Sequence, residues 1–318
     1  MSDNRPRLDR EQAIAAYLQY ANRLPQIDPS VVPTATQHVS NLLAIAGQFD
    51  LIVFDAFGVL NSGKQAIPGA VTAVATLKDQ GKRLAVITND ASSSADAIIA
   101  RHRGRGFDFD RESLISSQQF VAPLMARHAE IGLWGAMAPS SWPFDILPGQ
   151  VHALSDDPEL YDGVDGFVLI DSEGWTPNRQ NLLEQSLMRR ARPILVGNPD
   201  ICAPMGDFLS VESGYFAHKA ADMCGVMPQC VGKPYVEVFE EVMCRNPDVA
   251  ADRILMVGDT LHTDVLGGLA AGIKTLLVTH GGFLDGYGDL EGLYARSGLR
   301  PHFLARAIGN GLEQVAVA

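Results

Sequence analysis

Four short apolar runs organise the chain, and each of them ends in small or polar residues. The runs lie at residues 51–54, 83–87, 253–257 and 275–278. Their hydrophobic positions are continuous instead of alternating, which is typical of parallel strands buried on both faces of a sheet. Helical patterns lie between them, for example at residues 70–79, just ahead of a Gln80-Gly81 turn. The pattern therefore predicts an α/β protein with a doubly wound, Rossmann-like parallel sheet.

The stretch at residues 129–227 differs from the rest of the chain. It is richer in proline and tryptophan, and it has apolar runs of its own at residues 166–170 and 193–196. We therefore predict an inserted α/β domain at 129–227, between the two parts of a core at 49–128 and 228–318. Residues 1–48 form an N-terminal helical extension in this interpretation. Its amphipathic pattern at residues 10–24 predicts a helix that packs on the core or on a partner subunit.

Composition and charge narrow the classes of function. The chain has 318 residues, of which 47% are hydrophobic and 19% charged, as in ordinary globular proteins. A net charge of −12 argues against nucleic acid or an anionic membrane as a partner. It leaves room for a small anionic substrate, because a metal ion outweighs the average field locally. No apolar run reaches the roughly 18–20 residues that span a bilayer. The polar N-terminus and four cysteines without CxxC spacing lead us to expect a soluble cytoplasmic protein.

The first two runs end in residues that can carry chemistry. The carboxyl ends of parallel strands share one edge of the sheet, where ligands bind. Asp55 ends the first run, and a carboxylate there can attack phosphorus. Gly58 allows a tight turn whose N–H groups face an anion. Thr88 and Asn89 end the second run, where a hydroxyl and helix N–H groups would hold a phosphate oxygen. Helix capping is the alternative role for both positions.

Two later segments add a cation and two acids. Lys233 lies in a Gly-Lys-Pro segment, where its charge would position a nucleophile and offset charge on a transferred group. A solvated surface lysine is the alternative. Asp259 and Asp264 lie five residues apart on a strand-to-helix turn, and we expect them to converge with Asp55. Mg²⁺ prefers oxygen ligands and takes one or two carboxylates together with water and substrate phosphate.

The order of these segments resembles the motifs of the haloacid dehalogenase (HAD) superfamily. The order is Asp after a strand, Thr-Asn after a strand, Gly-Lys-Pro, and then Gly-Asp followed by Asp264. The stretch between Asp55 and Thr88 is too short for a cap domain, whereas that between Thr88 and Lys233 is long enough. This placement, with an Asn-Pro-Asp segment at Asn198, is similar to class IIA, which includes 4-nitrophenylphosphatases and nucleotide or pyridoxal phosphate phosphatases.

The resemblance implies a role for each matching residue. Asp55 would form an aspartyl-phosphate and bind Mg²⁺, while Lys233 would hold Asp55 in place. The remaining expected contacts are Gly58, Thr88 and Asn89 for the phosphoryl group, and the carbonyl of Phe57, Asp259 and Asp264 for the metal. The resemblance also implies a small phosphorylated substrate and a homodimer paired through the caps.

Phe57 departs from the phosphatase pattern. Phosphatase members carry a second Asp at this position, which protonates the leaving oxygen and later activates water. A phenyl ring cannot transfer a proton, and such a step is worth roughly 10²–10⁴-fold in rate. Three interpretations remain open: a phosphatase with another proton donor, a carbon–halogen or phosphonate hydrolase, and a weakly active or non-catalytic homologue that binds a phosphorylated ligand. The Asp259 and Asp264 pair favours phosphoryl chemistry over dehalogenation, and the missing early cap disfavours phosphonate cleavage.

The cap is where we expect substrate choice to be made. Trp175, in the loop after the run at 166–170, is a candidate for stacking on an aromatic or sugar ring of the substrate. Packing in the core of the cap is the alternative for this side chain. His218 and His262 are candidates for the proton donor that Phe57 cannot be, and their alternatives are a helix position and a solvated loop.

Overall fold

The computed structural model describes residues 5–310, and a seven-stranded parallel sheet forms its core. The strand order is β2-β17-β16-β15-β3-β6-β7, and every neighbouring pair is parallel. The strands are β2 (Gln37–His38), β3 (Leu51–Asp55), β6 (Arg83–Thr88), β7 (Leu114–Ser116), β15 (Ile254–Gly258), β16 (Lys274–Val278) and β17 (Phe303–Ala305). The predicted doubly wound α/β core is confirmed.

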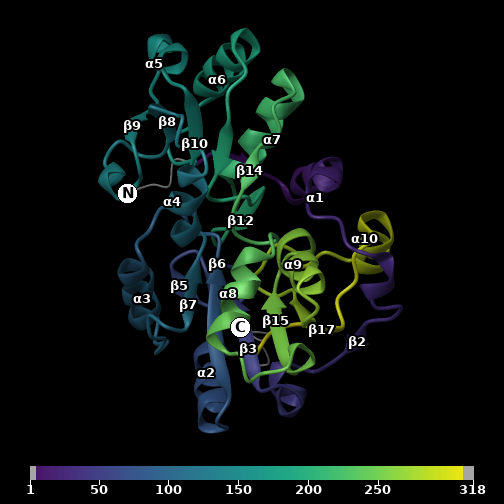
Figure 1. Ribbon diagram of the computed structural model, residues 1–318. Coiled ribbons are helices and arrows are strands. Elements are labelled where there is room, and N and C mark those ends of the chain that lie inside the picture. Colours follow the sequence, from purple (N-terminus) through teal and green to yellow (C-terminus); the bar gives the residue numbers. More distant parts are fainter. Residues whose placement is uncertain (1–4, 311–318) are drawn as a thin grey trace.

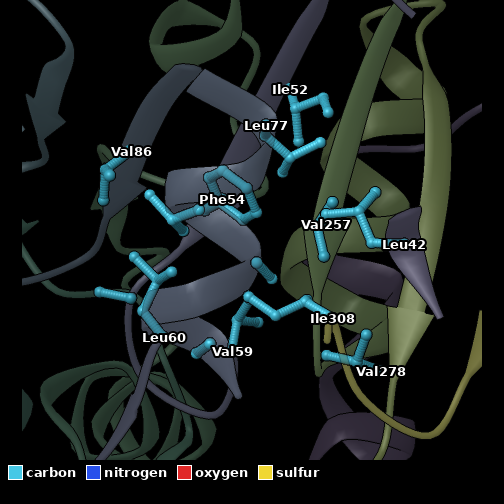
Figure 2. Packing of buried hydrophobic residues seen from close by; sticks show 14 of the residues in the cluster. Leu42, Ile52, Phe54, Val59, Leu60, Leu77, Val86, Val257, Val278 and Ile308 are labelled. Carbon is cyan, nitrogen blue, oxygen red and sulfur yellow. The ribbon is translucent and has the colours of Figure 1, made fainter. Parts of the chain in front are cut away.

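Helices cover both faces of this sheet, as the continuous apolar runs predict. Ile52 and Phe54 of β3 pack on one face with Leu77 of α2, which Figure 2 shows. Leu51 and Val53 of the same strand pack on the opposite face, in a cluster that includes residues of α8. Because successive side chains of a strand point to opposite faces, a central strand of this kind is apolar throughout. The core helices are α2 (Ala70–Asp79), α3 (Ala95–Gly104), α8 (Glu237–Arg245), α9 (Leu266–Ala270) and α10 (Leu290–Ser297).

A second parallel sheet forms the cap, which lies above the core in Figure 1. Its order is β14-β11-β10-β8-β9. The strands are β8 (Leu133–Met137), β9 (Gln150–Ala153), β10 (Gly166–Leu169), β11 (Ile194–Val196) and β14 (Gln229–Cys230). The helices of this part are α4 (Gln118–Ala126), α5 (Pro158–Gly163), α6 (Pro177–Arg189) and α7 (Ser213–Cys224). The strands expected at 166–170 and 193–196 are therefore β10 and β11.

The N-terminal segment ties the core to the cap. β1 (Arg7–Leu8) adds to an antiparallel sheet with β13 (Leu209–Val211) and β12 (Cys202–Pro204). Helix α1 (Arg10–Tyr20) follows and lies beside α7 and α9 in Figure 1. Its apolar side packs on core residues such as Leu266, and on Ile201 where the chain leaves β11. Below we call residues 5–24 the strap.

Two predicted domain boundaries differ from the sheets. Gln37–His38 belongs to the predicted extension, yet it forms the edge strand β2 of the core sheet. Gln229–Cys230 belongs to the predicted core, yet it forms the edge strand β14 of the cap sheet. Both strands have only two residues, too few for a hydrophobic period to reveal them. Within residues 5–310, no helix has the length and apolar character needed to cross a membrane.

Candidate active site

Three buried carboxylates meet at the carboxyl end of the core sheet. Asp55 is the last residue of β3, and Asp259 follows β15 directly. Asp264 lies one turn later in a π-helical segment, Leu261–Val265. One oxygen atom of each carboxylate lies within 4.8 Å of the others. The sequence-based expectation that the three acids converge therefore agrees with their positions.

Lys233 is buried between two of these acids. Its Nζ lies 2.5 Å from Asp55 Oδ1 and 2.8 Å from Asp264 Oδ1. Asp55 Oδ1 also accepts a hydrogen bond of 2.7 Å from the N–H of Ala56. Burial raises the pKa of Asp55 to about 7, and the Lys233 ammonium group opposes that shift. The lysine thus holds one oxygen of Asp55 in a fixed direction and favours the ionised carboxylate.

Backbone N–H groups hold the other two acids in place, and a glycine leaves room for one of them. Asp264 Oδ2 accepts from the N–H groups of Asp259 and Thr260, at 3.1 Å each. The wide π-turn that brings Asp264 back to these N–H groups is a form frequently found at functional sites. Asp259 Oδ2 accepts from the N–H of Phe283 at 2.6 Å. A Cβ atom on Gly58 would lie 1.9 Å from that oxygen, so only glycine fits there.

Thr88 and Asn89 connect the second strand to this cluster. The Asn89 side chain accepts from the N–H of Lys233 at 2.7 Å and donates to the carbonyl of Lys233 at 2.9 Å. Its Nδ2 also donates to Oδ1 of Asp200 at 2.8 Å. Asn89 therefore positions the lysine segment through its backbone, and Thr88 lines the cavity above the cluster.

A cavity of about 290 Å³ lies over the carboxylates, and the ends of both parallel sheets enclose it. Its floor comes from the core, with Asp55, Thr88 and Asp259 at the ends of β3, β6 and β15. Its roof comes from the cap, with Asp171 following β10 and Asp200 following β11. The site thus lies where the carboxyl ends of the core and cap sheets face each other, as ligand sites in parallel sheets commonly do.

Residues from the strap and from a short hairpin complete the walls. Arg5 lines the cavity and makes a bidentate contact with Asp171, at 3.1 and 3.0 Å. The hairpin β4 (Asn61–Ser62) and β5 (Gln65–Ala66) brings Gly63 to the cavity. Arg105 of the core donates to the carbonyl of Gly63 at 3.1 Å, and the N–H of Gly63 donates to the carbonyl of Pro204. Core, hairpin and cap are therefore linked around the opening.

Trp175, His218 and His262 lie neither in the carboxylate cluster nor in the lining of this cavity. Trp175 is buried in the core of the cap and donates to Gln180 at 2.9 Å, so the expected stacking on a substrate is replaced by packing. His218 stacks on Tyr20 of the strap, with ring centroids 4.8 Å apart. His262 lies between the two acids in sequence, but its ring stacks on Tyr17 at 5.0 Å. Neither histidine reaches the cavity as a stand-in for Phe57, whose own side chain does line it.

Several cavity residues were not predicted from the sequence. Arg5 lies in the extension, where no periodic pattern points to a site. Arg105 lies at the end of a core helix, where a single charged residue is usually solvated. Asp171 lies in the cap loop that also contains Trp175, and that loop was a candidate for substrate choice. Asp200 belongs to the Asn-Pro-Asp segment, which carried the family resemblance but had no assigned role. Its position after an apolar run is the one sequence signal that points to it.

The donor set of the cluster suits a hard divalent cation. All three side chains offer oxygen, which Mg²⁺ prefers, and three carboxylates share the space with one lysine. Burial and the neighbouring carboxylates raise the pKa of Asp259 well above its usual value. A cation bound among these oxygens would offset the cost of burying ionised carboxylates so close together.

Comparison with known proteins places the chain in a family. Residues 52–139 match the model of the haloacid dehalogenase-like hydrolases, and residues 230–306 match a related HAD-hydrolase-like model. The chain is 30% identical over 288 residues to D-glycerol 3-phosphate phosphatase from Mycobacterium tuberculosis, covering 86% of this chain and 75% of that one. It is 28% identical over 266 residues to human glycerol-3-phosphate phosphatase, covering 75% and 81%. The chain therefore belongs to the haloacid dehalogenase-like hydrolases.

Solved structures agree with the expected class IIA architecture. A possible sugar phosphatase of the HAD superfamily from Cytophaga hutchinsonii matches with a TM-score of 0.74 and 26% identity, over 86% of this chain and 99% of that one. The Mycobacterium tuberculosis glycerol phosphate phosphatase, solved in complex with magnesium, matches with a TM-score of 0.64 and 25% identity, over 86% and 80%. The predicted HAD core with an inserted α/β cap is confirmed.

Proposed function

We propose that this protein is a Mg²⁺-dependent phosphatase that transfers the phosphoryl group of a small phosphorylated metabolite to Asp55 and then to water. The observation that carries the proposal is the position of Asp55. Asp55 lines the cavity, and Lys233 Nζ orients its carboxylate from 2.5 Å. An oxygen atom of each of two further acids lies within 4.8 Å of it. A carboxylate that is held in one direction, beside a site for a divalent cation, suits nucleophilic attack on phosphorus.

The other residues divide the work of binding and orientation. Thr88 would hold a phosphoryl oxygen through its hydroxyl, and the Gly58 turn and Asn89 would complete that side of the site. Mg²⁺ would be held by Asp55, the carbonyl of Phe57 and Asp259, with Asp264 directly behind or among its ligands. When bound, it would neutralise charge on the phosphoryl group. Lys233 would keep Asp55 ionised and pointed at phosphorus.

The size of the cavity favours a small substrate. The cavity of about 290 Å³ has to hold the phosphoryl group as well as its alkyl or aryl part. A glycerol phosphate, the substrate in the names of the relatives above, is of suitable size. A net charge of −12 and the enclosed site are unsuited to nucleic acid. A homodimer paired through the caps and a cytoplasmic location belong to the same proposal.

Turnover of p-nitrophenyl phosphate tests the proposal directly. We expect hydrolysis by the native protein in the presence of Mg²⁺, and loss of it when the metal is removed with a chelator. Asp55→Asn keeps the size of the side chain but removes the nucleophile, so it should abolish turnover while the thermal midpoint stays close to native. Activity that survives this substitution, or none in the native protein with Mg²⁺, would contradict the proposal and direct attention to 2-haloacids and phosphonates.

A further inference from the structure

The cavity contains four carboxyl groups outside the metal cluster, and two of them are paired with arginines. The four are Asp90, Asp171, Asp200 and Glu212. Asp90 lies 2.5 Å from a guanidinium nitrogen of Arg101, and Asp171 is bound by Arg5 in the bidentate contact described above. Both oxygens of each of these two groups therefore already accept hydrogen bonds.

The remaining two carboxyl groups differ in how many of their oxygens accept a hydrogen bond. Glu212 uses both, since Oε1 accepts from the hydroxyl of Ser210 and Oε2 accepts from the amide of Asn198 at 3.0 Å. Asp200 accepts from Asn89 through Oδ1 only. Within residues 5–310 no hydrogen-bond donor contacts its Oδ2, and part of this side chain is open to the cavity. Of these four carboxyl groups, Asp200 is thus the one that lines the cavity with an oxygen that no donor of the described residues occupies.

The surroundings of Asp200 favour its protonated form. Burial is the largest cause and raises the pKa of Asp200 to about 8, with Asp55 and Glu212 adding to the shift. Lys233 and the amide of Asn89 oppose it. Tyr17 and Cys202 also face this carboxyl group, and burial raises the pKa of both, so neither adds a charge near neutral pH. A carboxylic acid that keeps its proton at neutral pH is what a general acid requires.

We propose that Asp200, from the junction between cap and core, is the acid–base residue that stands in for the aspartate missing at position 57. The inference rests on the proposed function, because it assigns a role within the same phosphoryl transfer. It differs from the family pattern in the origin of the residue: the proton comes from the cap side of the cavity, instead of from the loop that follows the nucleophile.

The two half-reactions balance with this residue alone. In the first, an oxygen of Asp55 forms a bond to phosphorus, and the bond from phosphorus to the leaving oxygen breaks. The leaving oxygen keeps the electron pair and takes the proton of Asp200. In the second, ionised Asp200 takes a proton from water while the water oxygen attacks phosphorus. The bond to Asp55 breaks with its electron pair returning to the carboxylate, inorganic phosphate leaves, and Asp200 is again protonated.

Two aryl esters of similar shape test this role in Asp200→Asn, assayed with Mg²⁺. Phenyl phosphate has a poor leaving group, because the pKa of phenol is about 10, as for the side chain of tyrosine. The p-nitrophenolate ion, in contrast, leaves without a proton. We expect kcat/KM to fall roughly 10²–10⁴-fold with phenyl phosphate and much less with p-nitrophenyl phosphate. The slow second step should also give a burst of about one equivalent of p-nitrophenolate in stopped flow. An equal loss with both esters and no burst would overturn the role of Asp200.

Further variants separate this role from a structural one. Asp171→Asn removes a carboxylate from the same cavity and should not show the selective loss with phenyl phosphate. The double variant Phe57→Asp with Asp200→Asn should regain phenyl phosphate turnover. With native protein, kcat/KM for phenyl phosphate should fall as the pH rises above the pKa of Asp200, and this limb should be missing in Asp200→Asn. A limb that persists unchanged in the variant contradicts the inference.

Phe57→Asp alone keeps the inference testable if Asp200→Asn does not fold. With an acid already present at Asp200, the new carboxyl group should raise phenyl phosphate turnover only slightly. A gain approaching 10²-fold would show that no acid acts in the native protein and would overturn the inference. Native turnover of p-nitrophenyl phosphate that depends on Asp55 would still support the proposed function, so the two claims can fail separately.

Discussion

The floor and the roof of the cavity are built on different principles. Both are the carboxyl ends of parallel sheets, but the floor consists of side chains that fix one another through short contacts. Lys233 joins Asp55 to Asp264, and backbone N–H groups hold Asp264 and Asp259. The roof is held through the strap, by Arg5 on Asp171 and by stacked rings between α1 and the cap. This difference teaches that the carboxylate cluster is fixed within the core, while the position of the roof over it depends on how the cap is attached.

The largest effect in this comparison is expected from a substitution that displaces a carboxylate of the floor without changing any charge. Gly58→Ala would place a Cβ atom 1.9 Å from Asp259 Oδ2, at a positive φ of 82°, so Asp259 has to move. A displacement of about 1 Å at reacting groups costs on the order of 10²-fold in rate. We expect kcat with p-nitrophenyl phosphate to fall by about that factor, and Mg²⁺ binding measured by calorimetry to weaken.

Gly81→Ala is the matched control for this substitution. Gly81 also has a positive φ, of 73°, but a Cβ atom there meets no other atom within 4 Å. The left-handed backbone alone costs about 1–2 kcal/mol of stability with an alanine. This variant should lose thermal stability and keep its kcat. Equal losses of kcat in both variants would mean that backbone strain, and not the position of Asp259, explains the first result.

The contact between the strap and the cap should contribute less to stability at acidic pH. His218 lies beneath the strap, and burial lowers its pKa to about 4. In the unfolded chain its pKa is about 6.5, so between these values the unfolded state binds the extra proton. The stability from neutral His218 is complete above about pH 6.5 and is lost as the pH falls toward 4.

Thermal unfolding at a series of pH values measures this dependence. Burial also lowers the pKa of His102 and His262, and of half-buried His302, so the comparison is between slopes. We expect His218→Gln to show a shallower fall of the midpoint than native protein, by an amount equivalent to about 1–3 kcal/mol. His152→Gln changes an exposed histidine of the cap and should keep the native slope. Equal slopes in all three proteins would exclude a role for His218.

The smallest expected effect concerns the Arg5 contact with the roof. Arg5→Met removes the bidentate contact with Asp171 and a cationic side chain from the cavity wall. A partly exposed ion pair is worth about 1 kcal/mol, so we expect KM for p-nitrophenyl phosphate to change by about fivefold, with a smaller change in kcat. Arg7→Met, two residues along the strap but stacked on Phe208, is the control and should keep both values. A loss of kcat as large as in Gly58→Ala would show that the Arg5 contact is also needed to place the reacting groups.

The floor could be predicted from the sequence, and most of the roof could not. Asp55, Thr88 and Asp259 each end a continuous apolar run, and parallel strands bring such ends together whatever the helices between them look like. Arg5 reaches the cavity because a two-residue strand, Arg7–Leu8, pairs with β13, whose Ser210 lies opposite Arg7 although nearly two thirds of the chain separates them. Such long-range pairing leaves no periodic trace in sequence. The same limit applies to Trp175, because the sequence around a tryptophan in a cap loop is the same whether its side chain packs inward or faces a ligand.

The most direct test of the account is the covalent state of Asp55 during turnover. Native protein and Asp200→Asn would be mixed with p-nitrophenyl phosphate and Mg²⁺, quenched in acid within one turnover, and measured by intact and tandem mass spectrometry. The account predicts a mass gain of one phosphoryl group, located at Asp55 and more abundant in Asp200→Asn, where release by water is slow. Turnover that proceeds with no phosphorylated protein in either sample, or with the group on another residue, would contradict it.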